Sequence, residues 1–332
     1  MQYLQATYIS ELTQNNSDEF FMPEWCILLF IFVCVALYYM YRYFNYTRLK
    51  LPKNFEMKME HLEYVIPIFR SLVKRPTKEI ILDFSQVTDI DEGAILALIA
   101  QGQKAEDLNP DKNIKIEAAT ILSDKVWALL SKNKNYKHKH LDLSKNKLKP
   151  ESDNRISPDD VDELVSELSN LGFVSYYNPF YDFMIELMGN AVEHGIRNKD
   201  INWWLWRERD IKGKCYRYVF VDMGVGILGS YKKAKTVPLY PFRNKCSLLI
   251  EALNGRLGST TGQRGRGRGL PQIMDIVKKE YVSDFVLITN CVSLQHKNGK
   301  FITKKVPDFV GTYCSWSISK KNYNAWKNSQ FT

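Results

Sequence analysis

Residues 181–195 read YDFMIELMGNAVEHG and set the character of the C-terminal half of the chain. Apolar residues recur along this stretch at the spacing of one helix face, which predicts a helix over about 179–194. Glu186, Asn190 and His194 lie four residues apart, so they line another face of the same helix. A carboxylate can take a proton from a water or hydroxyl, and an amide oxygen is a ligand that suits Mg²⁺.

Downstream, residues 219–227 read VFVDMGVGI. An apolar strand is predicted to end at Asp222, which is followed by Gly224 and Gly226. A carboxylate held at a strand end can accept a hydrogen bond from an exocyclic amine. Glycines lack a Cβ, so a flat base could approach the backbone closely at these two positions.

A third motif, GQRGRGRGL, covers residues 262–270. Gly265, Gly267 and Gly269 leave the backbone free to wrap an anion, and the helix predicted to follow offers unpaired N–H groups at its start. The loop lacks the G-K-[ST] ending of a P-loop, and no short strand leads directly into it as in a dinucleotide-binding fingerprint. Each motif is common alone, so their order carries the argument.

The order is a helix with E-x-x-x-N, a strand with D-x-G-x-G, a long insert, G-x-G-x-G-L opening a helix, and Gly311-Thr312 before a last strand. This order resembles the GHKL superfamily of gyrase, heat-shock chaperone, histidine-kinase and mismatch-repair ATPases. The resemblance implies a Bergerat-type α/β sandwich, of α+β class, over residues 155–320. It also implies ATP and Mg²⁺ as ligands, with residues from about 228 to 262 as a lid.

The resemblance assigns a role to each matching residue. Asn190 would coordinate Mg²⁺, and Glu186 would be the general base where one is used. Asp222 would bind the adenine amino group, with Thr312 supporting it through a hydroxyl or a water. Gly224 and Gly226 would border the base. The phosphates would be held by Gly265, Gly267 and Gly269. His194 is interpreted equally as a helix cap or a phosphate contact.

Upstream, strands at 79–84 and 114–118 alternate with helices at 89–107 and 123–130, which predicts a small α/β domain over residues 55–131. The segment 79–105 resembles a STAS domain, although Glu92 and Gly93 stand where a phosphorylatable serine is typical. The E-x-x-x-N-A-x-x-H-G form is closest to anti-sigma-factor serine kinases, which act on STAS partners. A regulatory protein partner is therefore expected.

Residues 25–44 begin with the uncharged run WCILLFIFVCVALYYM. Their length and the tyrosines at one end predict a transmembrane helix. Acidic residues precede the run and Arg42, Arg48, Lys50 and Lys53 follow it, so residues 1–24 are expected outside a cell membrane and the rest in the cytoplasm. A buried helix of a water-soluble protein is the alternative interpretation.

Composition sets wider limits. The chain is 45% hydrophobic and 25% charged, which suits a globular protein. Its net charge of +9 is concentrated partly in residues 132–154, interpreted as a solvated basic linker. Because no aromatic platform or basic helix accompanies that segment, no nucleic acid partner is expected. The six cysteines are scattered, which argues against a zinc site or a disulfide framework.

The favoured hypothesis is a membrane-anchored, ATP-binding regulatory protein that acts by phosphotransfer or partner switching. One alternative is a sensor histidine kinase, with His61 as the phosphoacceptor; the box around His61 lacks its arginine, and no antiparallel helix pair is predicted after it. Another alternative is a non-catalytic module in which ATP only orders the lid. A homodimer is compatible with all three.

Overall fold

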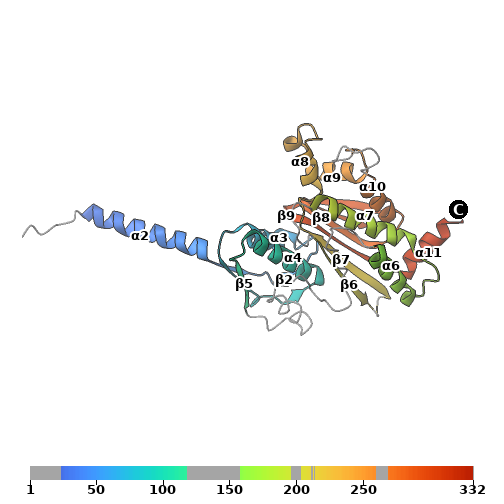
Figure 1. Cartoon of the computed structure of the whole chain (residues 1–332), viewed down its shortest axis with the longest axis horizontal. Helices are drawn as coiled ribbons and strands as arrows, with labels where there is room; N and C mark the ends of the chain where they lie inside the picture. The colour runs from blue at the N-terminus through green and yellow to red at the C-terminus, as the bar shows by residue number, and fades with distance from the viewer. Residues whose placement is uncertain are drawn as a thin grey trace, which may run out of the picture.

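A computed structural model describes residues 24–117, 158–195, 203–210, 212, 214–258 and 268–331. The architecture is mixed α/β. Figure 1 shows helix α2 (Glu24–Asn45) extending away from an N-terminal α/β unit, which in turn lies against a larger C-terminal unit. The predicted segment 1–23, the helix at 123–130 and the linker 132–154 lie outside the described residues.

The N-terminal unit is built on a parallel sheet in the order β1-β3-β5. Its strands are β1 (Tyr46–Lys50), β3 (Glu79–Asp83) and β5 (Asn113–Glu117), and a short pair, β2 (Asn54–Phe55) and β4 (Asp89–Ile90), lies beside it. Helices α3 (Leu62–Lys74) and α4 (Glu92–Leu108) supply most of the buried side chains. Strand β1 was not predicted, because its five residues carry only a weak alternating pattern.

The C-terminal unit contains a four-stranded antiparallel sheet in the order β6-β7-β9-β8. The strands are β6 (Trp203–Asp210), β7 (Cys215–Asp222), β8 (Ser283–Lys297) and β9 (Lys300–Ser319). Strands β8 and β9 form a long hairpin whose turn is Asn298-Gly299. Both turn residues have positive φ, 52° and 70°, which is the backbone geometry that Asn-Gly favours in tight hairpins.

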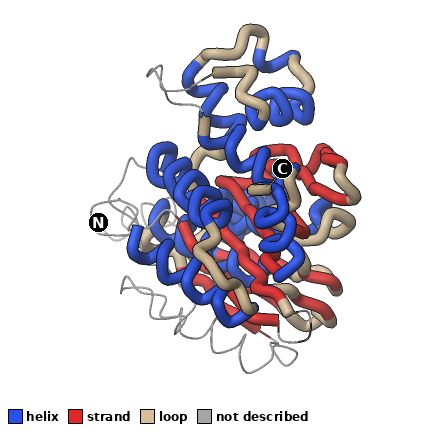
Figure 2. Tube along the Cα trace, turned by 90° about the vertical axis from the view of Figure 1, so that its right-hand side faces the viewer, coloured by secondary structure: helices blue, strands red, loops and turns tan. Residues whose placement is uncertain are grey.

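Helices cover one face of this sheet. Alternate side chains of β7 and β9, such as Tyr218, Phe220, Cys314 and Trp316, share a core with these helices. The helical elements are α6 (Pro158–Ser166), η2 (Glu167–Leu171), α7 (Asn178–Gly195), α8 (Ile227–Ala234), η3 (Tyr240–Phe242), α9 (Lys245–Leu253), α10 (Gly269–Lys278) and α11 (Lys320–Ser329). The group around α8 stands above the rest of the molecule in Figure 2.

The N-terminal unit covers the opposite face of the same sheet. Val221 and Tyr313, whose neighbours in sequence face the helices, belong to one core with the buried residues of α3 and α4. The rings of Phe69 on α3 and Phe309 on β9 lie 6.1 Å apart in an edge-to-face arrangement. The sheet is therefore buried on both faces, one against its own helices and one against the N-terminal unit.

The predicted transmembrane helix over 25–44 is wrong. Among the described residues, the structure contains no helix with both the length and the apolar character needed to cross a bilayer. The fully apolar part of α2, from Trp25 to Leu37, measures about 20 Å at about 1.5 Å per residue, short of the roughly 30 Å of hydrocarbon. The tyrosines that follow it are polar at their tips. The single-pass placement, with residues 1–24 outside a cell membrane, loses its basis with this helix.

Candidate functional site

Asp222 is the last residue of β7 and points toward the helices. Side chains alternate along a strand, and Tyr218 and Phe220 face the helical core while Val221 faces the N-terminal unit. Asp222 therefore projects from the same face as Phe220. Its side chain is buried, with the residue 8% exposed, so a charge at this position needs partners.

Those partners come from the adjacent turn and the adjacent strand. The backbone N–H of Gly224 donates to Oδ1 of Asp222 at 2.7 Å. The hydroxyl and backbone N–H of Thr312 also donate to this carboxylate, because Thr312 is its direct neighbour in the β7–β9 pairing. Burial nevertheless dominates and raises the pKa of Asp222 to about 6, against the opposing effect of these hydrogen bonds. Thr312 therefore lies directly beside Asp222 in the sheet.

The loop that carries Gly224 and Gly226 is fixed to strand β8. The hydroxyl of Thr289 accepts from the N–H of Ile227 at 2.9 Å. The Asn290 amide donates to the carbonyl of Val225 at 2.9 Å and accepts from the N–H of Gly229 at 3.2 Å. The two β8 side chains thus hold the loop where it enters α8.

Gly226 shows why this position needs glycine. Its φ is +73°, and a Cβ there would lie 2.8 Å from the hydroxyl oxygen of Thr289. Thr289 and Asn290 were not predicted as site residues. No motif marks them, because their role follows from the pairing of Thr289 with Thr312 across the sheet.

Helix α7 packs on β7 near the N-terminal end of the helix. Ring centroids of Phe180 and Tyr218 are 5.0 Å apart. From Phe180 to Asn190 the helix advances about 15 Å, and from Tyr218 to Asp222 the strand advances about 14 Å. The helix and the strand thus advance by similar lengths from this contact, one to Asn190 and the other to Asp222.

Gly269, the first residue of α10, lies against both polar residues of α7. A Cβ at this position would clash with the Glu186 carboxylate and lie 3.6 Å from the Asn190 amide nitrogen. That nitrogen is buried and has no hydrogen-bond partner among the described residues. Burial raises the pKa of Glu186, and the nearby Asp182 raises it further. The start of α10 thus meets a carboxylate of raised basicity and an amide nitrogen that has no partner among the described residues.

Binding of a metal ion beside Asn190 and Glu186 would depend on a ligand that supplies further oxygen atoms to the ion. The described residues contain no group of three or more His, Cys, Asp or Glu side chains able to hold a metal ion. Mg²⁺ commonly binds with one or two protein ligands and completes its shell with phosphate oxygens and waters. The Asn190 amide beside Glu186 fits that arrangement. Gly265, Gly267 and the His194 side chain lie outside the described residues.

Part of the predicted lid is described, up to residue 258. It consists of α8, η3 and α9, and the Tyr231 hydroxyl on α8 donates to the carbonyl of Gly258 at 3.1 Å. Helix α9 begins at an N-cap, where the Asn244 side chain accepts from the N–H of Ser247 at 3.1 Å. The insert is therefore ordered by its own contacts and follows directly from the loop after Asp222.

A scan against protein-family models finds no match to this chain, and searches of curated proteins and of solved structures find no significant match. The case for a function therefore rests on the arrangement of these side chains.

Proposed function

We propose that the chain is an ATP-binding regulatory protein of the GHKL type, with Mg²⁺ bound together with the nucleotide. The observation that carries the proposal is Asp222, a buried carboxylate held by Gly224 and Thr312 at the end of β7. Glu186 and Asn190, on α7, lie against Gly269 at the start of α10 and support the phosphate half of the proposal.

The chemistry of Asp222 suits an adenine ring. A carboxylate that already accepts from Gly224 and Thr312 keeps lone pairs free to accept from an exocyclic amine. Binding that amine would offset part of the cost of burying the charge. Gly224 and Gly226 add no side chains beside the base, and the Thr289 and Asn290 contacts keep their backbone in place.

We assign binding of the ATP phosphates to the start of α10. The first turn of this helix presents unpaired N–H groups and a positive dipole, which favours an anion. Bound Mg²⁺ would neutralise charge on the phosphates, with Asn190 as a protein ligand. Glu186 would accept the proton of an attacking water or hydroxyl. The oxygen of that water or hydroxyl would bond to the γ-phosphorus while the bond between the γ-phosphorus and ADP breaks.

The alternative functions require different residues of the site. In a sensor histidine kinase, His61 would receive the phosphoryl group, but its side chain is only 13% exposed and its ring lies 3.1 Å from the Glu56 carboxylate. We therefore favour transfer to water or to a hydroxyl of a regulatory protein partner. A non-catalytic module would need Asp222 and Asn190 but not Glu186.

Binding is tested with the purified chain by titration calorimetry with Mg²⁺-ATP. Asp222→Asn is expected to weaken binding by about tenfold or more, because an amide nitrogen would oppose the adenine amine. Asp275→Asn is the matched control, since Asp275 lies on α10 and pairs with Lys279 at the surface. Equal ATP affinity in Asp222→Asn and the wild type would refute the site.

Turnover is tested with γ-labelled ATP, with and without candidate partner proteins. Free labelled phosphate identifies an ATPase, labelled protein identifies a kinase, and neither identifies a binding module. Glu186→Gln should lower turnover about 100-fold or more while ATP affinity stays within about threefold, as expected for loss of a general base. Unchanged turnover in this variant would remove Glu186 from the mechanism.

A further inference from the structure

The strand β9 contains an irregularity next to the residue that supports Asp222. Thr312 pairs with Thr289 on β8, but the next β8 residue, Asn290, pairs with Phe309. Val310 and Gly311 therefore have no β8 residue opposite them and form a bulge. A bulge bends its strand and leaves backbone groups without ladder partners.

The bulge is fitted closely against Asp222. Gly311 has a φ of +90°, and a Cβ there would clash with the Asp222 carbonyl oxygen. The conformation of Val310 and Gly311 thus decides where β9 meets the end of β7, and with it where the Thr312 hydroxyl meets the Asp222 carboxylate.

A side chain from the N-terminal unit supplies the missing partner. Gln101 on α4 donates its Nε2 to the Val310 carbonyl at 2.9 Å, across 209 positions of sequence. Gln101 is fully buried, and its Oε1 has no partner among the described residues. Burying an amide in this way costs free energy, and the bond to the bulge is what offsets part of that cost.

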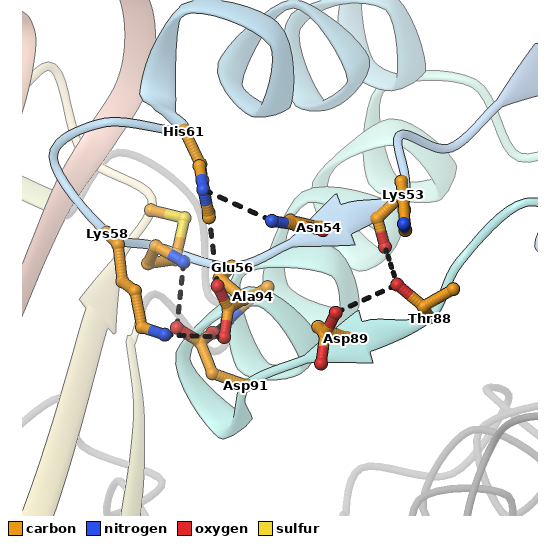
Figure 3. A network of polar contacts seen from close by, with 10 residues as sticks. Lys53, Asn54, Glu56, Lys58, His61, Thr88, Asp89, Asp91 and Ala94 are labelled. Atoms are coloured by element: carbon orange, nitrogen blue, oxygen red, sulfur yellow. Dashed lines mark hydrogen bonds and ion pairs between the residues drawn. The ribbon is translucent and has the colours of Figure 1, made fainter.

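Other contacts fix the position of α4, so the Gln101–Val310 hydrogen bond joins the helix to one defined point of β9. Asp91 caps the helix, accepting from the N–H of Ala94 at 2.7 Å and from the N–H of Met57 at 2.8 Å, within the network drawn in Figure 3. Gly93 lies against the Tyr313 hydroxyl so closely that a Cβ would clash with it. Helix α4 therefore touches β9 on both sides of Thr312, at Val310 and at Tyr313.

We propose that the N-terminal unit sets the ATP affinity of the C-terminal unit through the Gln101–Val310 hydrogen bond. Gln101 is a positioning residue: it holds the bulge that places Thr312 against Asp222. A partner that shifts α4 would loosen the bulge and release nucleotide, and ATP binding would in turn favour the present position of α4. The ATP part of this inference rests on the proposed function.

The test replaces Gln101 by methionine in the full chain, a change that keeps volume but removes the donor. Gln101→Met is expected to speed hydrogen–deuterium exchange of the amides at 309–313 and to weaken Mg²⁺-ATP binding about tenfold. Gln103→Met is the control, because the Gln103 amide bonds Asp107 on the same helix and should change neither readout.

The outcomes separate this inference from the proposed function. If the wild type binds no ATP, the proposed function fails, and exchange at 309–313 alone decides whether Gln101 holds the bulge. Wild-type exchange and wild-type affinity in Gln101→Met would overturn the inference. So would faster exchange spread evenly over both units with unchanged affinity, which indicates only lost stability. If Gln101→Met does not fold, Gln101→Asn, one methylene shorter, replaces it with the same expectations.

Discussion

At the scale of single residues, Asp222 combines a binding role with a cost in stability. Burial raises its pKa from 3.8 to about 6, so the folded protein binds a proton more tightly than the unfolded chain between these values. By linkage, the contribution of Asp222 to stability is fully present below about pH 4 and is lost as pH rises through about 6. A site that keeps a buried carboxylate charged at neutral pH is stabilised by its ligand.

The first prediction concerns the pH dependence of Asp222→Asn without nucleotide. The variant cannot ionise at this position, so its stability relative to the wild type should improve by about 1–3 kcal/mol between pH 5 and pH 7.5. Urea denaturation at both pH values measures the change. A stability difference between the two proteins that is the same at pH 5 and pH 7.5 would contradict the assigned pKa.

The second prediction concerns Gly311→Ala. A side chain at a φ of +90° is strained, and its Cβ would clash with the Asp222 carbonyl, so a loss of about 3 kcal/mol or more is expected. Gly299→Ala is the control, since Gly299 has a φ of +70° with no atom near its added Cβ, and should cost about 1 kcal/mol. Equal losses measured by urea denaturation would show that the bulge tolerates a side chain.

At the scale of elements, strand β8 acts as a support for the loop that follows β7. Asn290 itself has a φ of 51°, a conformation that asparagine tolerates better than most residues. Its amide bridges Val225 and Gly229, so one side chain closes the connection from the strand end into α8. The order of this loop therefore depends on a strand that comes about 60 residues later in the chain.

The third prediction follows from that support. Asn290→Ala should speed hydrogen–deuterium exchange of the amides at 225–231 and weaken ATP binding about tenfold, because a mobile loop must be ordered when the nucleotide binds. Asn328→Ala, at an exposed position of α11, is the comparison and should leave both unchanged. Protection at 225–231 equal to the wild type would mean that other contacts hold the loop.

At the scale of the whole molecule, the two units share a core. The buried residues of α3 and α4 form one cluster with the outer face of the C-terminal sheet. Ion pairs add to this contact at its edge, between Lys74 and Asp308 at 3.4 Å and between Lys304 and Glu63 at 3.7 Å. These exposed pairs contribute little compared with the apolar burial, so the units are expected to unfold together.

The fourth prediction tests this coupling with Phe69→Ala. Phe69 is 1% exposed and packs on Phe55 within its own unit and on Phe309 of β9. Its loss should cost about 3–5 kcal/mol and lower the melting temperature of both units in a single transition. Tyr64→Ala, on the exposed side of α3 with 43% exposure, should have a small effect. Separate transitions, with the C-terminal one unmoved, would show that the units are independent.

Local patterns in the amino-acid sequence were sufficient to predict several helices and strands. The helix over 179–194 and the strand that ends at Asp222 follow from periodicity, which acts over a few residues. The membrane prediction failed because it counted edge tyrosines toward the length of an apolar run whose core is too short.

The contacts around Asp222 and behind its strand could be seen only once the chain was folded. Cross-strand pairing brings Thr289 and Asn290 to the loop that follows Asp222. Packing of the two units brings Gln101 on α4 to Val310 on β9. Neither contact leaves a signal in sequence spacing, because register and packing bring distant residues together only after the sheet has formed. The residue types of the site could thus be predicted from the sequence, whereas the groups that hold these residues in place depend on the fold.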